Sequence, residues 1–491
     1  MKYKCIIFIK ELLRKSGGTM IFSSYEFVFL FLPITLIIYF ALSKMNKIKY
    51  QHIFLVLASL YFYGYFNYSY LILIIFSIVL NYLIAVGMVR HNFKDKIIKK
   101  VLFIVGIIFN VGLLGFFKYY DFFVSNLNFV LKTDFTLLHI MLPLGISFFT
   151  FQQLSFIVSI YKGEEEVPDF LTYMLFVTFF PQLIAGPIVL FSEMRPQFED
   201  ETRRKFNRDN FIYGFNMFVF GMSKKLIIAD TISKIVDAGF AMNELSFELS
   251  WFIIISYSIQ IYFDFSGYND MALGLAKMFN FDLTNNFDSP YKSQSISEFW
   301  RRWHITLGRA LTTYVYIPLG GNRKGLFRTC LNLFVVFLIS GIWHGANWTF
   351  IVWGILNGII IVAERLLGLN RYKSKSKFEK NLRITVTFII VNFLWVFFRS
   401  ESIGDAFCMV QSMLNPFNSN ILQILSINKF HLLYGIPVFC VSLYLMFFKE
   451  NIQKRCASII QKNKSYLYVA ILFVLCMICM NRVSPFIYFN F

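Results

Sequence analysis

Residues 330–344 read CLNLFVVFLISGIWH, an apolar run that ends on the imidazole of His344. A basic segment, Lys292 to Arg328, precedes this run, so the chain is expected to enter lipid near Cys330. On a straight helix His344 then lies ~21 Å deep. Crossing a ~30 Å hydrocarbon core takes ~20 apolar residues. The stretch therefore indicates a membrane helix that carries an ionisable side chain far from the surface where it enters.

The composition of the whole chain agrees with this interpretation. Of 491 residues, 57% are hydrophobic, 20% are aromatic and only 15% are charged, and the mean hydropathy is +0.59. Soluble domains contain about 45–50% apolar and about 25% charged residues. A soluble enzyme, a disordered protein and a disulfide scaffold are thereby excluded. The predicted fold is all-α, a polytopic helical bundle in the cell membrane, in contact with lipid over its apolar surface.

The charge balance is basic, with 47 Lys and Arg against 28 Asp and Glu, a formal net charge of +19. The aromatic residues lie inside apolar runs and do not alternate with basic ones, so we predict no nucleic-acid partner. The excess instead fits cytoplasmic loops that face an anionic leaflet. Cys476 and Cys479 have the spacing of a metal or redox motif, but they lie within the apolar run 470–480, so we expect no metal site.

About eleven to thirteen candidate membrane segments are present, several of them short or re-entrant. Three loops rich in Lys and Arg, at 292–328, 371–383 and 449–464, are expected in the cytoplasm, which places the chain end near Phe491 outside. The candidate segments are residues 26–43, 52–66, 69–89, 101–123, 137–160, 170–191, 211–222, 251–276, 330–345, 348–367, 384–398, 431–448 and 466–481.

Polar residues inside apolar segments mark candidate sites, because such groups are costly in lipid. Asp264 and Asp270 lie in one such segment, six positions apart, and share a helix face only if the helix breaks near Gly267. Two roles stay open for this cluster. It caps a broken helix or pairs with an arginine, or it lines a polar tunnel through the membrane.

A second cluster lies in the basic segment. Trp300, Trp303 and Leu307 recur at helical spacing, which predicts one amphipathic helix at the cytoplasmic interface, with His304 beside Trp303. Further along, Gly320, Gly321 and Asn322 suit a tight turn. The backbone amides of that turn, with Arg323 and Lys324, form either a phosphate site or an ordinary basic cytoplasmic turn.

The third cluster surrounds His344. An imidazole has a pKa near working pH and suits general-base catalysis, whereas a structural histidine that bridges two helices is the other open interpretation. Gly341 and Gly345 flank it and allow close backbone approach or a local break, which favours a site.

Together these residues resemble the membrane-bound O-acyltransferase (MBOAT) superfamily, and in particular the branch of the alginate O-acetyltransferase membrane subunit. The resemblance covers about residues 20–400. It is carried by Pro143–Gln153, Phe180–Pro187, Tyr262–Gly267, Phe299–His304, Tyr316–Gly325, Gly341–Phe350 and Trp395–Arg399.

Residues 1–19 have two open interpretations, a short amphipathic helix at the membrane surface or an N-terminal extension that is not translated. Members of this family begin at a sequence like Met20–Ser24, which favours Met20 as the start. The apolar core of residues 1–19, Cys5–Ile9, is also shorter than the roughly 7–15 residues of a secretory signal. The expected domains are this extension, an acyltransferase core over 20–400, and C-terminal membrane helices over 401–491.

The resemblance implies a helical bundle around a central tunnel, open to an acyl donor from the cytoplasm and to an acceptor from outside. The family's catalytic histidine corresponds to His344 and its second histidine to His304. The chain departs from the pattern at Thr312-Thr313, where the branch has Arg-Asp, and at Asn357, where it has histidine.

We therefore expect an O-acyltransferase that moves acetyl groups from a cytoplasmic thioester such as acetyl-CoA to a cell-surface polysaccharide. The transfer is direct or passes through an extracytoplasmic acyltransferase or glycan-binding partner, and no bound cofactor is expected. D-alanyl transfer to teichoic acid, a glycan transporter or flippase, and an inactive scaffold are the alternatives. His344 and His304 are the expected catalytic residues. The residues expected to line the donor path or tunnel are Arg301, Arg302, Trp303, Asp270, Asn347, Gly320, Gly321, Asn322, Arg323 and Lys324.

Overall fold

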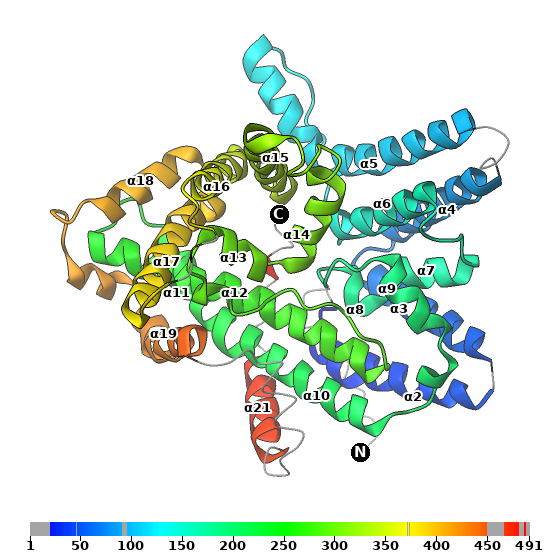
Figure 1. Cartoon of the computed structure of the whole chain (residues 1–491). Coiled ribbons are helices and arrows are strands. Elements are labelled where there is room, and N and C mark those ends of the chain that lie inside the picture. Colours follow the sequence, from blue (N-terminus) through cyan, green and yellow to red (C-terminus); the bar gives the residue numbers. More distant parts are fainter. Residues whose placement is uncertain are drawn as a thin grey trace. The chain divides into compact units, whose positions relative to one another are not determined.

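The computed structural model of the chain describes residues 20–45, 47–90, 96–370, 372, 374–448, 466–480 and 486–487. The expected N-terminal extension lies outside this described part. The final four residues, 488–491, which the predicted topology places outside the cell, also lie outside it. Within it the chain is helical and contains no β-strand (Figure 1). The prediction of an all-α fold is confirmed.

The chain forms two compact units. The first comprises the residues up to Phe218 together with Tyr268–Thr284, and the second comprises Val219–Gly267 and the residues from Asn285 onward. The helices of the first unit are α2 (Leu32–Leu42), α3 (Ile48–Phe66), α4 (Ser69–Arg90), α5 (Lys96–Leu131), α6 (Ile146–Lys162), α7 (Phe170–Thr178), α8 (Phe180–Leu183) and α9 (Phe191–Glu199). Those of the second are α11 (Asp230–Phe240), α13 (Ile296–Arg302), α14 (Ile305–Leu311), α15 (Gly325–His344), α16 (Trp348–Leu366), α17 (Lys377–Arg399), α18 (Ile403–Leu414), α19 (Lys429–Phe448) and α21 (Tyr466–Cys479). The division falls within α10 (Arg208–Ser223) and α12 (Phe247–Met278).

Eight helical stretches in the described part are long and apolar enough to cross a membrane, which confirms a multi-pass membrane protein. They are Phe27–Met45, Ser69–Arg90, Lys96–Leu131, Arg208–Phe240, Gly325–His344, Trp348–Leu366, Lys377–Arg399 and Lys429–Phe447. This count is lower than the number of segments expected from the sequence. Several expected segments form shorter or interrupted helices. One example is α6, which is 17 residues long, and another is the pair α7 and α8, which is interrupted at Phe179 ahead of Pro181.

Buried amides join the helices of the first unit. Asn81 on α4 donates to Gln153 Oε1 on α6 at 2.7 Å, and Asn110 on α5 donates to Asn81 Oδ1 at 2.6 Å. Tyr173 donates to the same oxygen of Gln153 at 3.3 Å, and the side-chain N–H of Gln153 donates to the hydroxyl of Ser77 at 3.0 Å. In lipid, hydrogen bonds between side chains of neighbouring helices take the place of a hydrophobic driving force. The network therefore explains how these largely apolar helices pack in one arrangement.

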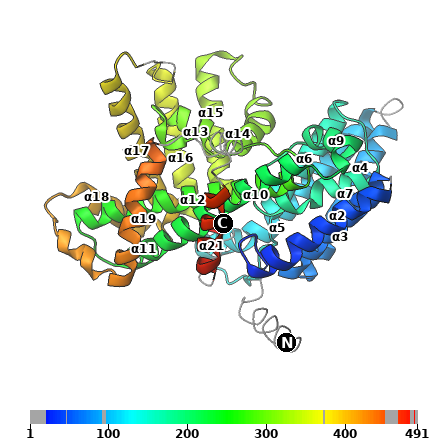
Figure 2. The same cartoon turned by 90° about the horizontal axis from the view of Figure 1, so that it is seen from below.

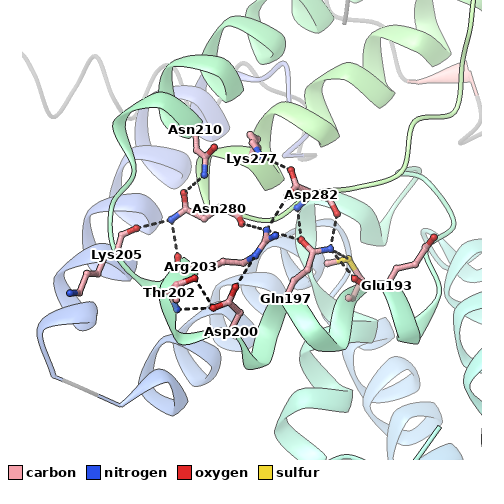
Figure 3. A network of polar contacts seen from close by, with 11 residues as sticks. Glu193, Gln197, Asp200, Thr202, Arg203, Lys205, Asn210, Lys277, Asn280 and Asp282 are labelled. Carbon is pink, nitrogen blue, oxygen red and sulfur yellow. Dashed lines mark hydrogen bonds and ion pairs between the residues drawn. The ribbon is translucent and has the colours of Figure 1, made fainter. Parts of the chain in front are cut away.

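A polar network also fixes the loop after α9 to the end of α12 (Figure 3). Arg203 donates to the carbonyl oxygen of Asn280 at 2.7 Å and forms an ion pair with Asp282 at 2.9 Å, and Gln197 accepts from the backbone N–H of Asp282 at 2.7 Å. Asn280 has a positive φ of 68°, a conformation that asparagine tolerates well. The network thus closes a turn that few residue types would form.

In the second unit, α15 and α16 run side by side (Figures 1 and 2). A Cβ atom on Gly341 would lie 2.4 Å from the carbonyl oxygen of Phe350 and 3.0 Å from the Cα atom of Gly354. Only glycine permits this approach. The helix ends at His344 and the next residue, Gly345, has an extended conformation. The close approach and the break expected from the two glycines are both present.

The expected single amphipathic helix through Trp300, Trp303 and Leu307 is wrong. The chain forms α13 and α14 instead, and His304 between them has a left-handed φ of 46°. Trp303 pairs in an antiparallel bridge with Phe287, and the backbone N–H of Ile305 donates to the carbonyl oxygen of Asn286 at 3.1 Å. This pairing with residues 286–288 is a tertiary contact, and it overrides the local helical periodicity.

Candidate active site

A cavity of about 550 Å³ lies in the second unit among α13, α14, α15 and α16. Its wall is largely apolar and aromatic, with a few cationic and hydroxyl groups. Three of the residues expected at the site from the sequence, Arg301, Trp303 and His304, line it together. Other side chains in its wall include Trp300, Leu307, Thr312, Thr313, Leu333, Phe337, Ser340, Ile361 and Arg365. Such a mixture, with Arg301, Arg309 and Arg365 among largely apolar side chains, fits an organic group that carries a few polar atoms.

His304 is held in place by Asn286. Oδ1 of Asn286 lies 3.3 Å from Nδ1 of His304 and accepts hydrogen bonds from the backbone N–H of Thr306 at 3.1 Å and from its hydroxyl at 2.7 Å. Because this oxygen already accepts a backbone N–H, it acts as an acceptor and Nδ1 of His304 carries the proton. The lone pair of the neutral ring is then on Nε2.

The ring of His304 is buried against aromatic neighbours. The ring of Phe265 meets it edge-on with centroids 4.8 Å apart, and that of Trp343 lies 6.1 Å away. Burial disfavours the imidazolium and lowers the pKa of His304 from 6.5 to about 3. The ring is therefore neutral at physiological pH and can accept a hydrogen bond.

His344 is the last residue of α15 and is 3% exposed. Its ring packs edge-on against Trp353 and Phe398, with centroids 5.2 and 5.1 Å away. His344 itself is not part of the cavity wall, but Leu333, Phe337 and Ser340 are. These positions are spaced by three or four residues and His344 follows four residues later, so it continues the same face of α15.

The other residues expected at the site are more widely distributed. Arg302 forms an ion pair with Glu298 at 2.7 Å, and Asn347 caps α16 through Thr349 and donates to the carbonyl oxygen of Glu401 at 2.9 Å. Asp270 is buried and belongs to the first unit.

The turn Gly320–Lys324 does not line the cavity, although it has the expected geometry. Gly320 and Gly321 have φ values of 102° and 56°, as a tight turn requires, whereas Asn322 does not have a positive φ. The side chains of Arg323 and Lys324 are exposed. Within the described ranges no group of His, Cys, Asp and Glu is arranged to hold a metal ion.

The positions that depart from the family pattern are part of this site. Thr312 and Thr313 stand in the cavity wall. Asn357 on α16 accepts a hydrogen bond from the indole N–H of Trp300 at 2.9 Å and donates to the carbonyl oxygen of Trp353 at 2.9 Å. The amide therefore orients a tryptophan that lines the cavity.

Glu364 is a residue that the sequence reasoning missed. Its carboxylate, on α16, accepts the backbone N–H groups of Ile296 at 2.6 Å and Ser297 at 2.9 Å. It thus satisfies the N-terminus of α13, the helix that leads to Trp303 and His304. A glutamate in an apolar helix next to a basic loop is the only signal that the sequence offers for this role.

A second feature that the sequence did not explain is the pair Lys224 and Lys225. Nζ of Lys225 lies 2.8 Å from Asp230 and 2.7 Å from Asp264, and all three side chains are buried. The other oxygen of Asp264 accepts the backbone N–H of Ile487 at 2.7 Å. The helix α12 is continuous through Gly267, so it does not break between Asp264 and Asp270. Asp264 therefore pairs with a lysine, which is a structural role.

Comparison with known proteins shows which family this chain resembles in sequence. The family model of the membrane-bound O-acyltransferases matches residues 159–403. Peptidoglycan O-acetyltransferase of Helicobacter pylori is 44% identical over 421 residues, which are 80% of this chain and 80% of that protein. Probable alginate O-acetylase AlgI of Pseudomonas aeruginosa is 38% identical over 418 residues, 84% of this chain and 78% of that protein. Teichoic acid D-alanyltransferase of Bacillus subtilis is more distant, at 25% over 272 residues.

The structure is a helical membrane protein whose largely apolar cavity contains a buried, neutral imidazole. The sequence is extensively similar to those of acyltransferases. The chain belongs to the membrane-bound O-acyltransferase family. It is a multi-pass membrane O-acyltransferase, which sets aside the transporter and the inactive scaffold.

Proposed function

We propose that this protein transfers acetyl groups from a cytoplasmic acetyl thioester to hydroxyl groups of a cell-surface polysaccharide, directly or through an extracytoplasmic partner. The identities of 44% and 38% to an O-acetyltransferase and a probable O-acetylase support acetyl as the group and a glycan as the acceptor. The similarity to D-alanyltransferases is weaker and covers about half of the chain, 52% in the relative from B. subtilis.

In the proposed reaction the acceptor hydroxyl attacks the thioester carbonyl while His344 removes its proton. The C–S bond then breaks and the thiolate leaves, taking up a proton. His304 orients the donor from the cytoplasmic side, with Nε2 as the hydrogen-bond acceptor that its bond to Asn286 implies. If a partner carries the acetyl group onward, the attacking hydroxyl belongs to that partner and the proton transfer is the same.

The observation that carries this proposal is the stripe on α15. Leu333, Phe337 and Ser340 line the cavity that contains His304, and His344 extends the same stripe by one turn. A thioester that enters beside His304 and lies along this face has its reactive end directed toward His344. This arrangement supports acyl transfer within the membrane.

The test uses cells that lack the native copy and express either the wild type or His344→Ala. General-base assistance is worth about 10²–10⁴-fold, so acetyl esters on envelope glycans, measured by mass spectrometry, should fall by that order. The amount of protein in the membrane should be unchanged. Acetylation at the wild-type level in His344→Ala would reject the role of His344 as general base. D-alanyl esters on the glycans of wild-type cells would show that the transferred group is D-alanyl and not acetyl.

A matched pair of variants tests His304. Both His304 and His139 have left-handed backbones, with φ values of 46° and 47°, but His139 is exposed and lies in the first unit. Asparagine tolerates this conformation, so His304→Asn and His139→Asn both preserve the backbone. Only His304→Asn should reduce acetylation. Equal activity in the two variants would remove His304 from the site.

A further inference from the structure

A second cavity, of about 580 Å³, opens in the second unit between the segment before α13 and the connection from α16 to α17. Its wall is strongly basic. Five cationic side chains line it, against one carboxylate, that of Glu298. The cationic residues are Arg301, Lys375, Lys377, Lys380 and Arg383. Its volume lies within the range of about 300–1,000 Å³ that small-molecule sites occupy.

Lys375 lies on the connection, whereas Lys377, Lys380 and Arg383 lie on the first turns of α17. Both segments are attached to the rest of the unit. Arg383 donates to the carbonyl oxygens of Gln294 at 3.2 Å and Leu369 at 3.0 Å, and its guanidinium lies 5.0 Å from the centre of the Tyr372 ring. Ser374 donates to the side chain of Gln294 at 2.6 Å. These bonds hold the connection against the segment that leads into α13, so the concave wall is built by specific contacts.

The protein neutralises only part of the positive charge of this wall. Glu379, at the start of α17, accepts the backbone N–H of Lys375 at 2.7 Å and attracts the side chains of Lys375 and Arg383. The carboxylate of Glu298 is engaged with Arg302 at 2.7 Å and with the backbone N–H of Gln294 at 2.8 Å. Among the residues that the structure describes, no carboxylate forms an ion pair with Arg301, Lys377 or Lys380. The positive-inside rule accounts for lysines in this loop but not for their arrangement around a hollow. A ligand with several negative charges is the group that fits such a wall.

The basic cavity and the cavity of His304 share part of their walls, because Arg301 and Asn370 line both. One side is basic and polar, and the other is largely apolar and contains the imidazole. A coenzyme A thioester has the same sequence of properties, with a phosphorylated nucleotide at one end and a slender neutral arm that carries the thioester at the other.

We propose that this basic cavity binds the phosphate groups of a coenzyme A thioester, whose pantetheine arm passes Arg301 into the cavity of His304. The inference rests on the proposed acetyl transfer and names its donor subsite. It assigns the phosphates to the connection from α16 to α17 and the first turns of α17, whereas the sequence suggested the turn Gly320–Lys324, which lines neither cavity.

The experiment compares wild-type membranes with the double variant Lys377→Gln/Lys380→Gln, using acetyl-CoA and acetyl-pantetheine as donors. Charge-assisted contacts to phosphate are lost in the variant, so the KM for acetyl-CoA should rise about 10–100-fold while kcat changes little. The KM for acetyl-pantetheine, which has no nucleotide, should be the same in both proteins. Adenosine 3′,5′-bisphosphate should inhibit the wild type and have a weaker effect on the variant.

The control is Lys47→Gln/Lys49→Gln, which removes the same charge from exposed positions of the first unit and should leave both KM values unchanged. An unchanged KM for acetyl-CoA in Lys377→Gln/Lys380→Gln would overturn the proposal, and so would an equal rise for both donors, which indicates damage to the fold. Transfer from an acetylated carrier protein but not from acetyl-CoA would overturn it as well. If no thioester supports transfer in the wild type, the proposed function itself fails.

Discussion

Oδ1 of Asn286 lies 3.3 Å from Nδ1 of His304, and through this contact the extended segment before α13 sets the protonation of the imidazole in the cavity. Asn286→Asp places a carboxylate there, which favours the imidazolium and raises the pKa of His304. We expect the acid limb of the pH–activity profile to move to higher pH.

The profile is measured as acetyl transfer by membranes between pH 5 and 9. Asn207→Asp is the matched control, because Asn207 caps the start of α10 in the first unit and aspartate caps equally well. An Asn286→Asp profile that coincides with the control would show that Asn286 does not influence the protonation of His304 during the reaction.

Burial of His304 also predicts how stability depends on pH. The pKa of His304 is 6.5 in the unfolded chain and about 3 in the folded one. Between these values the unfolded state binds a proton that the folded state does not, so stability is greatest above pH 6.5 and falls on acidification. The contribution is at most about 1.4 kcal/mol per pH unit.

The melting temperature in detergent should therefore decrease from pH 7 to pH 4, and it should decrease less steeply in His304→Asn, which has no titrating ring. His139→Asn keeps His304 and should follow the wild type. Parallel curves for wild type and His304→Asn would contradict the burial of this ring.

Glu364 should prove important for the stability of the site. Glu364→Ala leaves two backbone N–H groups of α13 without their acceptor, at a cost of about 1–3 kcal/mol for each buried group. We expect a lower melting temperature and reduced acetyl transfer. Glu364→Gln retains one acceptor and should have an intermediate effect. Glu401→Ala removes an exposed carboxylate and serves as the control; equal melting temperatures for the two alanine variants would refute the anchoring role.

Lys225 is expected to be needed for folding of the second unit. In Lys225→Met, Asp230 and Asp264 stay buried without the cation between them, and the loss of one partner from a buried ion pair costs about 3–5 kcal/mol. The amount of protein recovered from the membrane and its melting temperature should both fall. Lys234 lies on the adjoining helix α11 and is exposed, so Lys234→Met should have little effect. Indistinguishable variants would mean that the cluster adds nothing to stability.

The contact between α15 and α16 should not tolerate a methyl group at position 341. Gly341→Ala places Cβ 2.4 Å from a backbone carbonyl oxygen, so the two helices must separate and move His344. Loss of both stability and acetyl transfer is expected. Gly112→Ala on α5 meets no atom within 4 Å and should be neutral or slightly stabilising, since alanine favours helix by about 0.5–1 kcal/mol. Similar melting temperatures in both variants would contradict the close packing.

The sequence by itself determined that the chain lies in lipid and which family it resembles. Apolar runs of 18 or more residues require a helical membrane protein, because a backbone in lipid must satisfy its own hydrogen bonds. The glycines beside His344 also predicted the close approach and the end of α15. These features depend on neighbours in the chain, so their spacing is visible in the sequence.

Only the tertiary structure decided which distant residues meet. Periodicity predicted one helix through Trp303 and Leu307, but pairing with residues 286–288 turns the chain at His304. The sequence does not explain a lysine at position 225, whereas the structure pairs it with Asp264. The basic cavity forms only because Arg301 and Lys380, which are far apart in the chain, line the same hollow. A one-dimensional pattern records the direction in which a side chain leaves its helix, whereas its partner depends on how the helices pack in three dimensions.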